Sequence, residues 1–145
     1  MKPKIDINCD LGESYGHFKV GQDAQIMPHI TSANVACGFH SGDPVTMAHT
    51  VELAKKCGVA VGAHPGYPDL MGFGRREMKL NSEELKSYIM YQVGALQAFA
   101  KASGTDLQHV KPHGALYNIA ARDKNIAGTI AEAILSIDSK IIVLG

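Results

Sequence analysis

Asp10 and Glu13 are the first residues along the chain whose types and spacing could do chemistry. They stand three residues apart in "NCDLGESYG", where Gly12 and Gly16 favour an exposed turn over a helix. Paired carboxylates can divide the work of a general acid and a general base when their surroundings push their pKa values apart. The alternative is a solvated loop in which Asp10 only caps a turn.

Histidines follow the next two apolar runs. His40 lies in "ANVACGFHSGDP", and His64 begins "HPGYPDLMGFGRR". Together with Asp10 and Glu13, their imidazoles would give a mixed nitrogen and oxygen ligand set for a divalent metal ion, in which Asp10, His40 and His64 are the metal candidates. The sequence contains no HExxH motif and no Cys/His cluster, and a single histidine is more often a core residue. Catalytic roles for both histidines therefore stay open beside a metal site.

Lys111 and His113 flank Pro112 in "VKPHGALYN". Alternation along an extended segment would put both side chains on one face, where a lysine beside a histidine could polarise an oxygen or bind phosphate. Gly114 would let the backbone come close to a ligand, although packing or a helix terminus could equally explain these residues. The catalytic candidates are Asp10, Glu13, His40, His64, Lys111 and His113.

Residues 64–76 form a longer connection than α/β units normally use, and long connections are often lids or binding segments. Arg75 and Arg76 could hold a carboxylate or phosphate through the guanidinium fork, or form a solvated surface pair. Asp43 precedes Pro44 and is equally well explained as a helix N-cap. The substrate-binding candidates are Asn8, Asp43, Tyr67, Arg75, Arg76 and Asn118. No comparable setting surrounds His17, His29, His49 or His109.

Alternating strands and helices must position these side chains. Apolar runs predict strands at 5–9, 30–37, 59–63, 109–112 and 141–144. Helices are predicted from Pro44 to Gly58, from the Asn81 capping box to Gly104, and over 126–137. This order predicts an α/β fold with a parallel sheet and right-handed crossovers. The loops after the strands of such a sheet meet at one edge, which is where catalytic residues collect.

Length and composition predict one domain, 1–145. The chain has 145 residues, of which 46% are hydrophobic and 19% charged, as in ordinary globular proteins. The last apolar run, 141–144, comes where a barrel would need more strands, because a full (β/α) barrel takes about 200 to 250 residues. We therefore expect an incomplete, parallel-stranded (β/α) barrel-like domain, with an open five-stranded sheet as the alternative.

Charge and cysteine content point to a cytoplasmic protein without nucleic-acid or membrane partners. Fourteen basic residues balance fourteen acidic ones, with no run of either sign. Three cysteines without a CxxC pair, and no charged segment followed by a long apolar one at the start, suit a reducing cytoplasm. No apolar run reaches the roughly 20 residues of a membrane-spanning helix.

Four motifs in this sequence closely resemble the LamB/YcsF family: "IDINCDLGESYG", "ANVACGFHSGDP", "GAHPGYPDLMGFGRR" and "VKPHGALYN", in the expected order across residues 5–118. The resemblance implies a seven-stranded barrel-like fold similar to the glycoside hydrolase and deacetylase superfamily, whose related members bind a divalent metal through Asp and His at strand ends. It also implies that this chain is the N-terminal part of the family's usual length.

The resemblance implies a reaction too: ATP-driven hydrolysis of the lactam 5-oxo-L-proline to L-glutamate by a 5-oxoprolinase, in which this chain would act with subunits B and C. A lactam is a poor electrophile, so one route is phosphorylation of its carbonyl oxygen before water attacks. We assign Asp10 or Glu13 as the base for water and His40 and His64 as ligands or acid/base partners. Lys111 with His113 would stabilise oxyanion or phosphate charge, and Arg75 or Arg76 would hold the substrate carboxylate.

Two other functions remain open. One is a metal-dependent amide hydrolase or deacetylase that acts alone, without ATP. The other is a noncatalytic subunit that positions substrate, which the absence of a phosphate-binding P-loop from the sequence would suit. The sequence also leaves open which subunit binds ATP and whether the protein is a homo-oligomer.

Overall fold

Five parallel strands form one sheet in the computed structural model, which describes residues 5–145. They are β1 (Asn8–Leu11), β2 (Ser32–Ala36), β3 (Ala60–His64), β4 (Leu107–Val110) and β5 (Ile142–Val143). Their order across the sheet is their order along the chain. A (β/α) barrel has this sequential order, whereas a doubly wound sheet reverses its order at a switch point. The predicted α/β, barrel-like class is confirmed.

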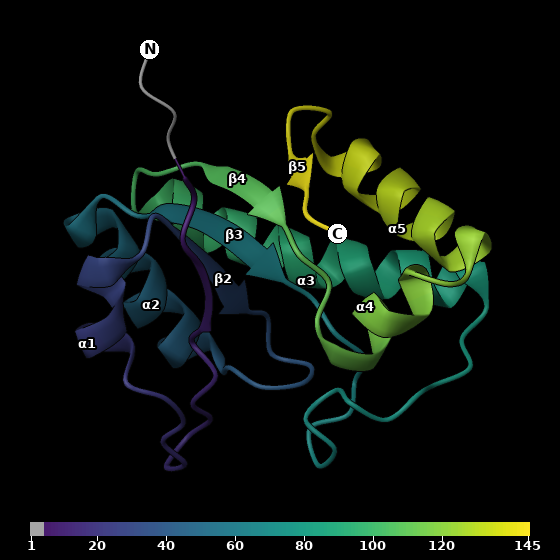
Figure 1. Ribbon diagram of the computed structural model, residues 1–145, viewed down its shortest axis with the longest axis horizontal. Coiled ribbons are helices and arrows are strands. Elements are labelled where there is room, and N and C mark those ends of the chain that lie inside the picture. Colours follow the sequence, from purple (N-terminus) through teal and green to yellow (C-terminus); the bar gives the residue numbers. More distant parts are fainter. Residues whose placement is uncertain (1–4) are drawn as a thin grey trace.

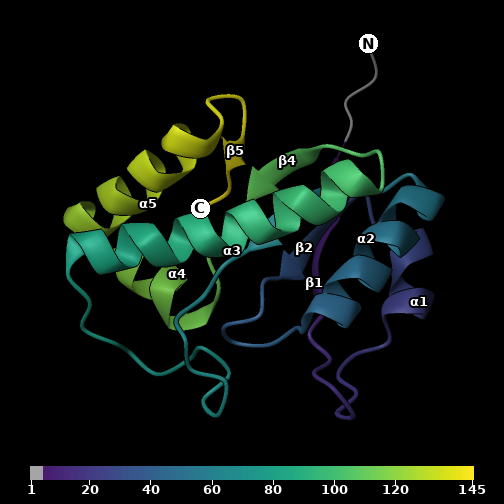
Figure 2. The same cartoon turned by 180° about the vertical axis from the view of Figure 1, so that it is seen from behind.

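The helices of the structure are α1 (Asp23–Ile26), α2 (Pro44–Cys57), α3 (Ser82–Ala102), α4 (Gly114–Ala120) and α5 (Lys124–Ile137), and a 3-10 turn, η1 (Met27–His29), follows α1. Helices α2 and α3 lie on one face of the sheet. This face is toward the viewer in Figure 2, and in Figure 1 the helices lie behind the strands. Helix α5 packs against α3. Within residues 5–145, no helix is long and apolar enough to cross a membrane.

The helices predicted from Pro44 to Gly58, from Asn81 to Gly104 and over 126–137 are present as α2, α3 and α5, with Asp43 and Asn81 as N-caps of the first two. Helices α1 and α4 were not predicted, because four and seven residues are too few to show an apolar helical period. Two strand predictions were displaced: β1 begins at Asn8 rather than residue 5, and β4 spans Leu107–Val110 rather than 109–112. Pro112 lacks the N–H that would continue β4.

The two faces of the sheet differ in polarity because side chains alternate along each strand. The helix-covered face is apolar and belongs to the hydrophobic core, with Ala33, Val35, Val61, Ala63 and Val110. The opposite, inner face carries hydrogen-bonded polar side chains, among them Asn8, Asp10, Ser32, Asn34 and His109. This polar face leads directly to the carboxyl ends of the strands.

Loop 65–81 is fastened to α3 by Gln92. The side-chain amide of Gln92 donates to the Gly66 carbonyl at 3.0 Å and accepts from the Gly66 N–H at 3.0 Å. Gln92 is completely buried. The loop that follows β3 therefore begins at a position fixed by the middle of α3.

The capping box of α3 gives a stability prediction. The Asn81 side chain accepts from the Glu84 N–H at 2.9 Å, and the Glu84 side chain accepts from the Asn81 N–H at 3.0 Å. We expect N81A to lower the free energy of unfolding by about 1 kcal/mol, because it leaves the Glu84 N–H without its cap. Urea denaturation measures this change, and N81S, which keeps a capping oxygen, is the control. Equal losses in both variants would contradict a capping role.

Candidate functional site

Polar side chains from successive strand ends meet at one edge of the sheet. Asp10 lies in β1, His64 ends β3, and Lys111 directly follows β4. Glu13 comes from loop 12–22 and His113 from the turn before α4. Loops 12–22 and 65–81 both extend from this edge in Figure 1. Parallel strands that point the same way explain why residues up to a hundred positions apart converge here.

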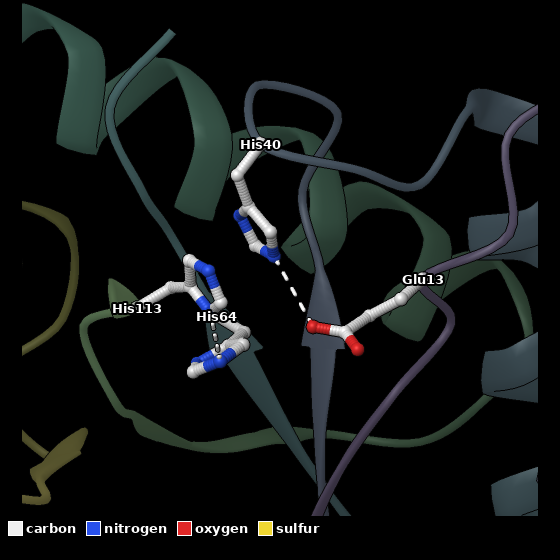
Figure 3. Close-up of side chains that lie close together, drawn as sticks. All are labelled: Glu13, His40, His64 and His113. Atoms are coloured by element: carbon white, nitrogen blue, oxygen red, sulfur yellow. Dashed lines mark hydrogen bonds and ion pairs between the residues drawn. The ribbon is translucent and has the colours of Figure 1, made fainter. Parts of the chain in front are cut away.

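Glu13, His40, His64 and His113 form the centre of the site, which we call the histidine cluster (Figure 3). One nitrogen or carboxylate oxygen from each lies within 4.8 Å of the others. The rings of His40 and His113 stack with centroids 3.7 Å apart and planes inclined by 6°. Glu13 Oε1 lies 3.5 Å from His40 Nε2. All three imidazoles are buried, and Glu13 is the member that reaches solvent.

Backbone carbonyls determine which ring nitrogens carry hydrogen. His64 Nδ1 lies 2.6 Å from the Lys111 carbonyl oxygen, and His113 Nε2 lies 2.8 Å from the Phe73 carbonyl oxygen. A carbonyl oxygen only accepts, so both of these nitrogens must donate. In neutral rings the remaining nitrogens, His64 Nε2 and His113 Nδ1, present lone pairs, and they face each other at 2.9 Å. Two lone pairs so close require a proton or a cation near them.

The histidine cluster fits a divalent metal ion. Both ring nitrogens of His40 are buried and make no hydrogen bond within residues 5–145, which is uncommon for buried polar atoms. One His40 nitrogen, with the facing nitrogens of His64 and His113 and the Glu13 carboxylate, gives three nitrogen donors and one oxygen donor. Zn²⁺ and related ions accept this donor set. Of the predicted ligands, His40 and His64 belong to the cluster, and Asp10 lies beside it.

Asp10 is held as a carboxylate. Its Oδ1 accepts from Lys111 Nζ and from Asn34 Nδ2, each at 2.7 Å, and its Oδ2 lies 3.4 Å from His64 Nε2. Burial pushes the pKa of Asp10 upward, but the interactions with His64, Lys111 and Asn34 outweigh it and hold the pKa well below its usual range. Asp10 therefore remains ionised throughout the neutral range.

Burial dominates the electrostatics of the other cluster members. It raises the pKa of Glu13, and it lowers the pKa of His40 to about 3 and that of His113 to about 4. His40 and His113 are therefore neutral at pH 7, with lone pairs available. The two carboxylates differ in the same sense as a working acid/base pair, since Asp10 is held ionised and Glu13 binds a proton more readily.

Loop 65–81 covers the stacked rings closely at Gly74. A Cβ atom on residue 74 would lie 2.7 Å from His40 Cβ and 2.9 Å from His113 Cδ2, and its φ of +64° also favours glycine. The preceding Phe73 has a positive φ of 53° and supplies the carbonyl that accepts from His113. The loop thus provides one wall of the site through its backbone.

A pocket of about 450 Å³ opens beside the histidine cluster. Its lining includes Asp10, His64, Arg75, Lys111, His113 and Asn118. The structure therefore brings all six catalytic candidates to this pocket or to the adjoining cluster, in which His40 stacks on His113. Of the substrate-binding candidates, Arg75 and Asn118 join them.

Tyr67 and Arg76 do not line this pocket. Tyr67 is 2% exposed and belongs to the hydrophobic core. Arg76 donates from Nε to both Asp69 carboxylate oxygens, at 2.9 and 3.0 Å, so its guanidinium is engaged. Arg75 makes no ion pair within the described chain, and its guanidinium carbon lies 5.6 Å from the Phe73 ring centroid. Arg75 is therefore the arginine available to a ligand.

Asn8 and Asp43 also have structural partners. Asn8 donates to Ser32 Oγ at 2.7 Å on the inner face of the sheet. The Asp43 carboxylate caps α2 by accepting from the Val45 N–H at 2.8 Å, and it accepts from the Gly16 N–H at 2.9 Å. The backbone N–H of Gly16 is the main cause that lowers the Asp43 pKa to about 2. Both residues support the site from outside the pocket.

Two groups at the site were not predicted from the sequence: the Asn34 amide, which binds Asp10, and the Phe73 carbonyl, which binds His113. The sequence could have indicated Asn34, because it is the one polar amide residue inside the apolar run 33–37. Phe73 acts through its backbone, which no residue type reveals.

Acidification should destabilise the fold through His40 and His113. Their pKa values are lowered from 6.5 to about 3 and about 4, so below pH 6.5 the unfolded chain binds more protons than the folded one. We expect the free energy of unfolding to fall as the pH decreases from about 6.5 to about 4.5, by up to about 1.4 kcal/mol per pH unit for each histidine. Urea denaturation across this range measures the slope. H40Q should reduce it, and an unchanged slope in H40Q would contradict the role of His40.

Known proteins similar to this chain match it along nearly its whole length. The chain is 61% identical over 141 residues to a protein of Pyrococcus furiosus named as the A subunit of 5-oxoprolinase, a match that covers 97% of this chain and 55% of the relative. The crystal structure of a lactam utilization protein from Thermus thermophilus superposes with a TM-score of 0.96 at 55% identity, over 97% of this chain and 57% of that one. The chain thus spans about half the length of the curated relatives it matches.

A more distant structure supports the fold alone. A putative cellobiose-phosphate cleavage protein from Enterococcus faecalis V583 matches with a TM-score of 0.56 at 18% identity, over 94% of this chain and 56% of that one. The profile of the LamB/YcsF family matches residues 5–145. This match takes in every side chain of the histidine cluster and of the adjoining pocket, and we conclude that the chain belongs to the LamB/YcsF family.

Proposed function

We propose that this chain takes part in the ATP-dependent hydrolysis of 5-oxo-L-proline to L-glutamate, as the A component of a 5-oxoprolinase that also contains subunits B and C. One observation carries the proposal: a carboxylate–histidine site lies at the same pocket as Arg75, which forms no ion pair with any other part of residues 5–145. Relatives named as the A subunit of 5-oxoprolinase support the substrate and the existence of further subunits.

The pocket offers a complement to each end of 5-oxoproline. The substrate carries a carboxylate, which the guanidinium fork of Arg75 can bind through two parallel hydrogen bonds. Its lactam carbonyl is polar, and the Lys111 ammonium and the His113 ring also line the pocket. Asn118 adds an amide that can donate to or accept from the ring. This arrangement would present the lactam carbon to the histidine cluster.

In the ring-opening reaction, residues of the cluster and of the adjoining pocket have different roles. Transfer of a phosphoryl group from ATP to the lactam oxygen would activate the ring carbon, and water would then add to that carbon. The C–N bond would break as the ring nitrogen takes up a proton, and a second water would hydrolyse the resulting acyl phosphate to glutamate and phosphate. Glu13, with its raised pKa, takes the proton from water. The Lys111 ammonium stabilises the negative charge that develops on oxygen, whereas the N–H of the neutral His113 ring is already donated to the Phe73 carbonyl. Asp10 stays ionised and holds the Lys111 ammonium at 2.7 Å, at the edge of the pocket.

The donor set of the histidine cluster favours a second candidate, an amide hydrolase that uses a divalent metal and no ATP. In that enzyme Glu13, His40, His64 and His113 would hold the metal ion. A bound metal ion supplies Lewis-acid polarisation of a carbonyl and an acidified water. Asp10 would then be the carboxylate left to accept a proton. The two candidates thus differ in the role of Glu13 and in their need for ATP.

The first test is glutamate release from 5-oxoproline by the natural protein that carries this sequence. We expect release only when ATP and candidate B and C subunits are both present, because the lactam must be activated before water attacks. Glutamate is measured with and without ATP, alone and in each mixture. Release without ATP, together with one bound metal ion per chain, would establish the second candidate. No release in any mixture of folded subunits would refute the substrate assignment.

Arg75 gives a test of substrate binding. We expect R75Q to raise KM for 5-oxoproline by about 10- to 100-fold, because a charge-assisted hydrogen bond contributes about 1.5–3 kcal/mol. Steady-state kinetics measure this change. R76Q is the matched neighbour and should raise KM much less, because Arg76 is engaged by Asp69. Equal increases in both variants would show that the loop, and not the Arg75 charge, is responsible.

A further inference from the structure

A buried polar chain lies behind Asp10 on the inner face of the sheet. Asn34 of β2 is 0% exposed and His109 of β4 is 1% exposed, and neither lines the pocket. The two side chains meet across β3, with His109 Nε2 2.7 Å from Asn34 Oδ1. Asn34 in turn contacts Asp10. The chain His109–Asn34–Asp10 therefore links the interior of the sheet to the site.

The direction of every hydrogen bond in this chain follows from the Asp10 carboxylate. An ionised carboxylate only accepts, so the Asn34 group at 2.7 Å from Asp10 Oδ1 must be the NH₂. Asn34 Oδ1 then faces His109 and accepts from Nε2. The second Asn34 N–H donates to Asn8 Oδ1 at 2.5 Å, and Asn8 Nδ2 donates to Asn34 Oδ1 at 3.1 Å. The Asn34 amide is thus fully used and cannot flip without losing these bonds.

Gly62 creates the space that this chain occupies. In the sheet register Gly62 pairs with Asn34 on one side and with His109 on the other. A Cβ atom on residue 62 would overlap the His109 ring, so the imidazole lies directly over the glycine. The contact between side chains of β2 and β4 depends on this gap in β3.

The Asp10 side chain is exposed enough to change its orientation unless hydrogen bonds hold it. Its side chain is 37% exposed and could otherwise turn toward solvent. Lys111 and Asn34 both donate to Oδ1, and this leaves Oδ2 directed toward His64 at 3.4 Å. Lys111 is itself partly exposed, at 30%, whereas Asn34 is completely buried. The buried amide is therefore the more rigid of the two donors.

We propose that Asn34 and His109 are positioning residues for Asp10. The His109 Nε2–H orients the Asn34 amide, and the Asn34 NH₂ orients the Asp10 carboxylate so that Oδ2 faces His64 and the pocket. The effect on turnover rests on the proposed function, but the hydrogen bonds themselves do not.

Nitrogen-15 NMR of the histidine rings tests the hydrogen bonds without any assay of activity. In the wild-type chain we expect a proton on Nε2 of His109 that is protected from exchange with water, identified by its absence from H109Q. N34A should lose this protected signal, because the acceptor is gone. A wild-type His109 ring that carries its proton on Nδ1 would overturn the proposal, even if N34A does not fold. A protected Nε2 proton that persists in folded N34A would overturn it as well.

Kinetics of two His109 variants test the positioning. H109L fills the space without a donor and should lower kcat by about 10- to 100-fold with KM for 5-oxoproline nearly unchanged, because Asp10 loses its alignment and Arg75 does not. H109Q retains an N–H donor and should recover most of kcat. Equal losses of kcat in both variants would show a packing role and overturn the proposal. Absence of lactam turnover in the wild type would refute the proposed function and leave the NMR result to decide on the hydrogen bonds.

Discussion

The facing nitrogens of His64 and His113 are the constraint on which the site depends. Each ring donates its other nitrogen to a backbone carbonyl, so the two lone pairs 2.9 Å apart can be accommodated only by a positive species. The surrounding structure holds this arrangement: β3 ends at His64, and His113 lies in the turn before α4. His40 stacks on His113, and Glu13 supplies a carboxylate nearby. Apolar side chains at these positions could fill the same space, but they would present no lone pairs to a proton or a cation.

Much of the fold could be predicted from the sequence, because helix caps and apolar periods are local signals. Asp43 before Pro44 and the Asn81 capping box mark two helix starts correctly. The errors come from elements that local patterns cannot define. Strand β1 is bounded by where β2 offers a partner, and α4 is too short to show a period. Pairing and tertiary contacts, rather than residue types, set those limits.

The site was predictable to the extent that it lies at strand ends. That rule brought Asp10, His64 and Lys111 together, because parallel strands deliver them to one edge. It could not separate Arg75 from Arg76, which are adjacent in sequence and differ only in the ion pair that one makes with Asp69. Residues inside the strands, such as Asn34, were overlooked because an inner polar face is unusual for a sheet covered by helices.

The reciprocal bonds between Gln92 and Gly66 have a consequence for how molecules reach the histidine cluster. Moving the start of loop 65–81 would break two buried hydrogen bonds, at a cost of about 1–3 kcal/mol for each group left unpaired, or would drag α3 along. Since α3 packs on the sheet and on α5, this end of the loop behaves as a fixed wall rather than a swinging lid. This fixed wall therefore limits how far the adjoining pocket, which Arg75 and Asn118 help to line, can change shape when a molecule enters it.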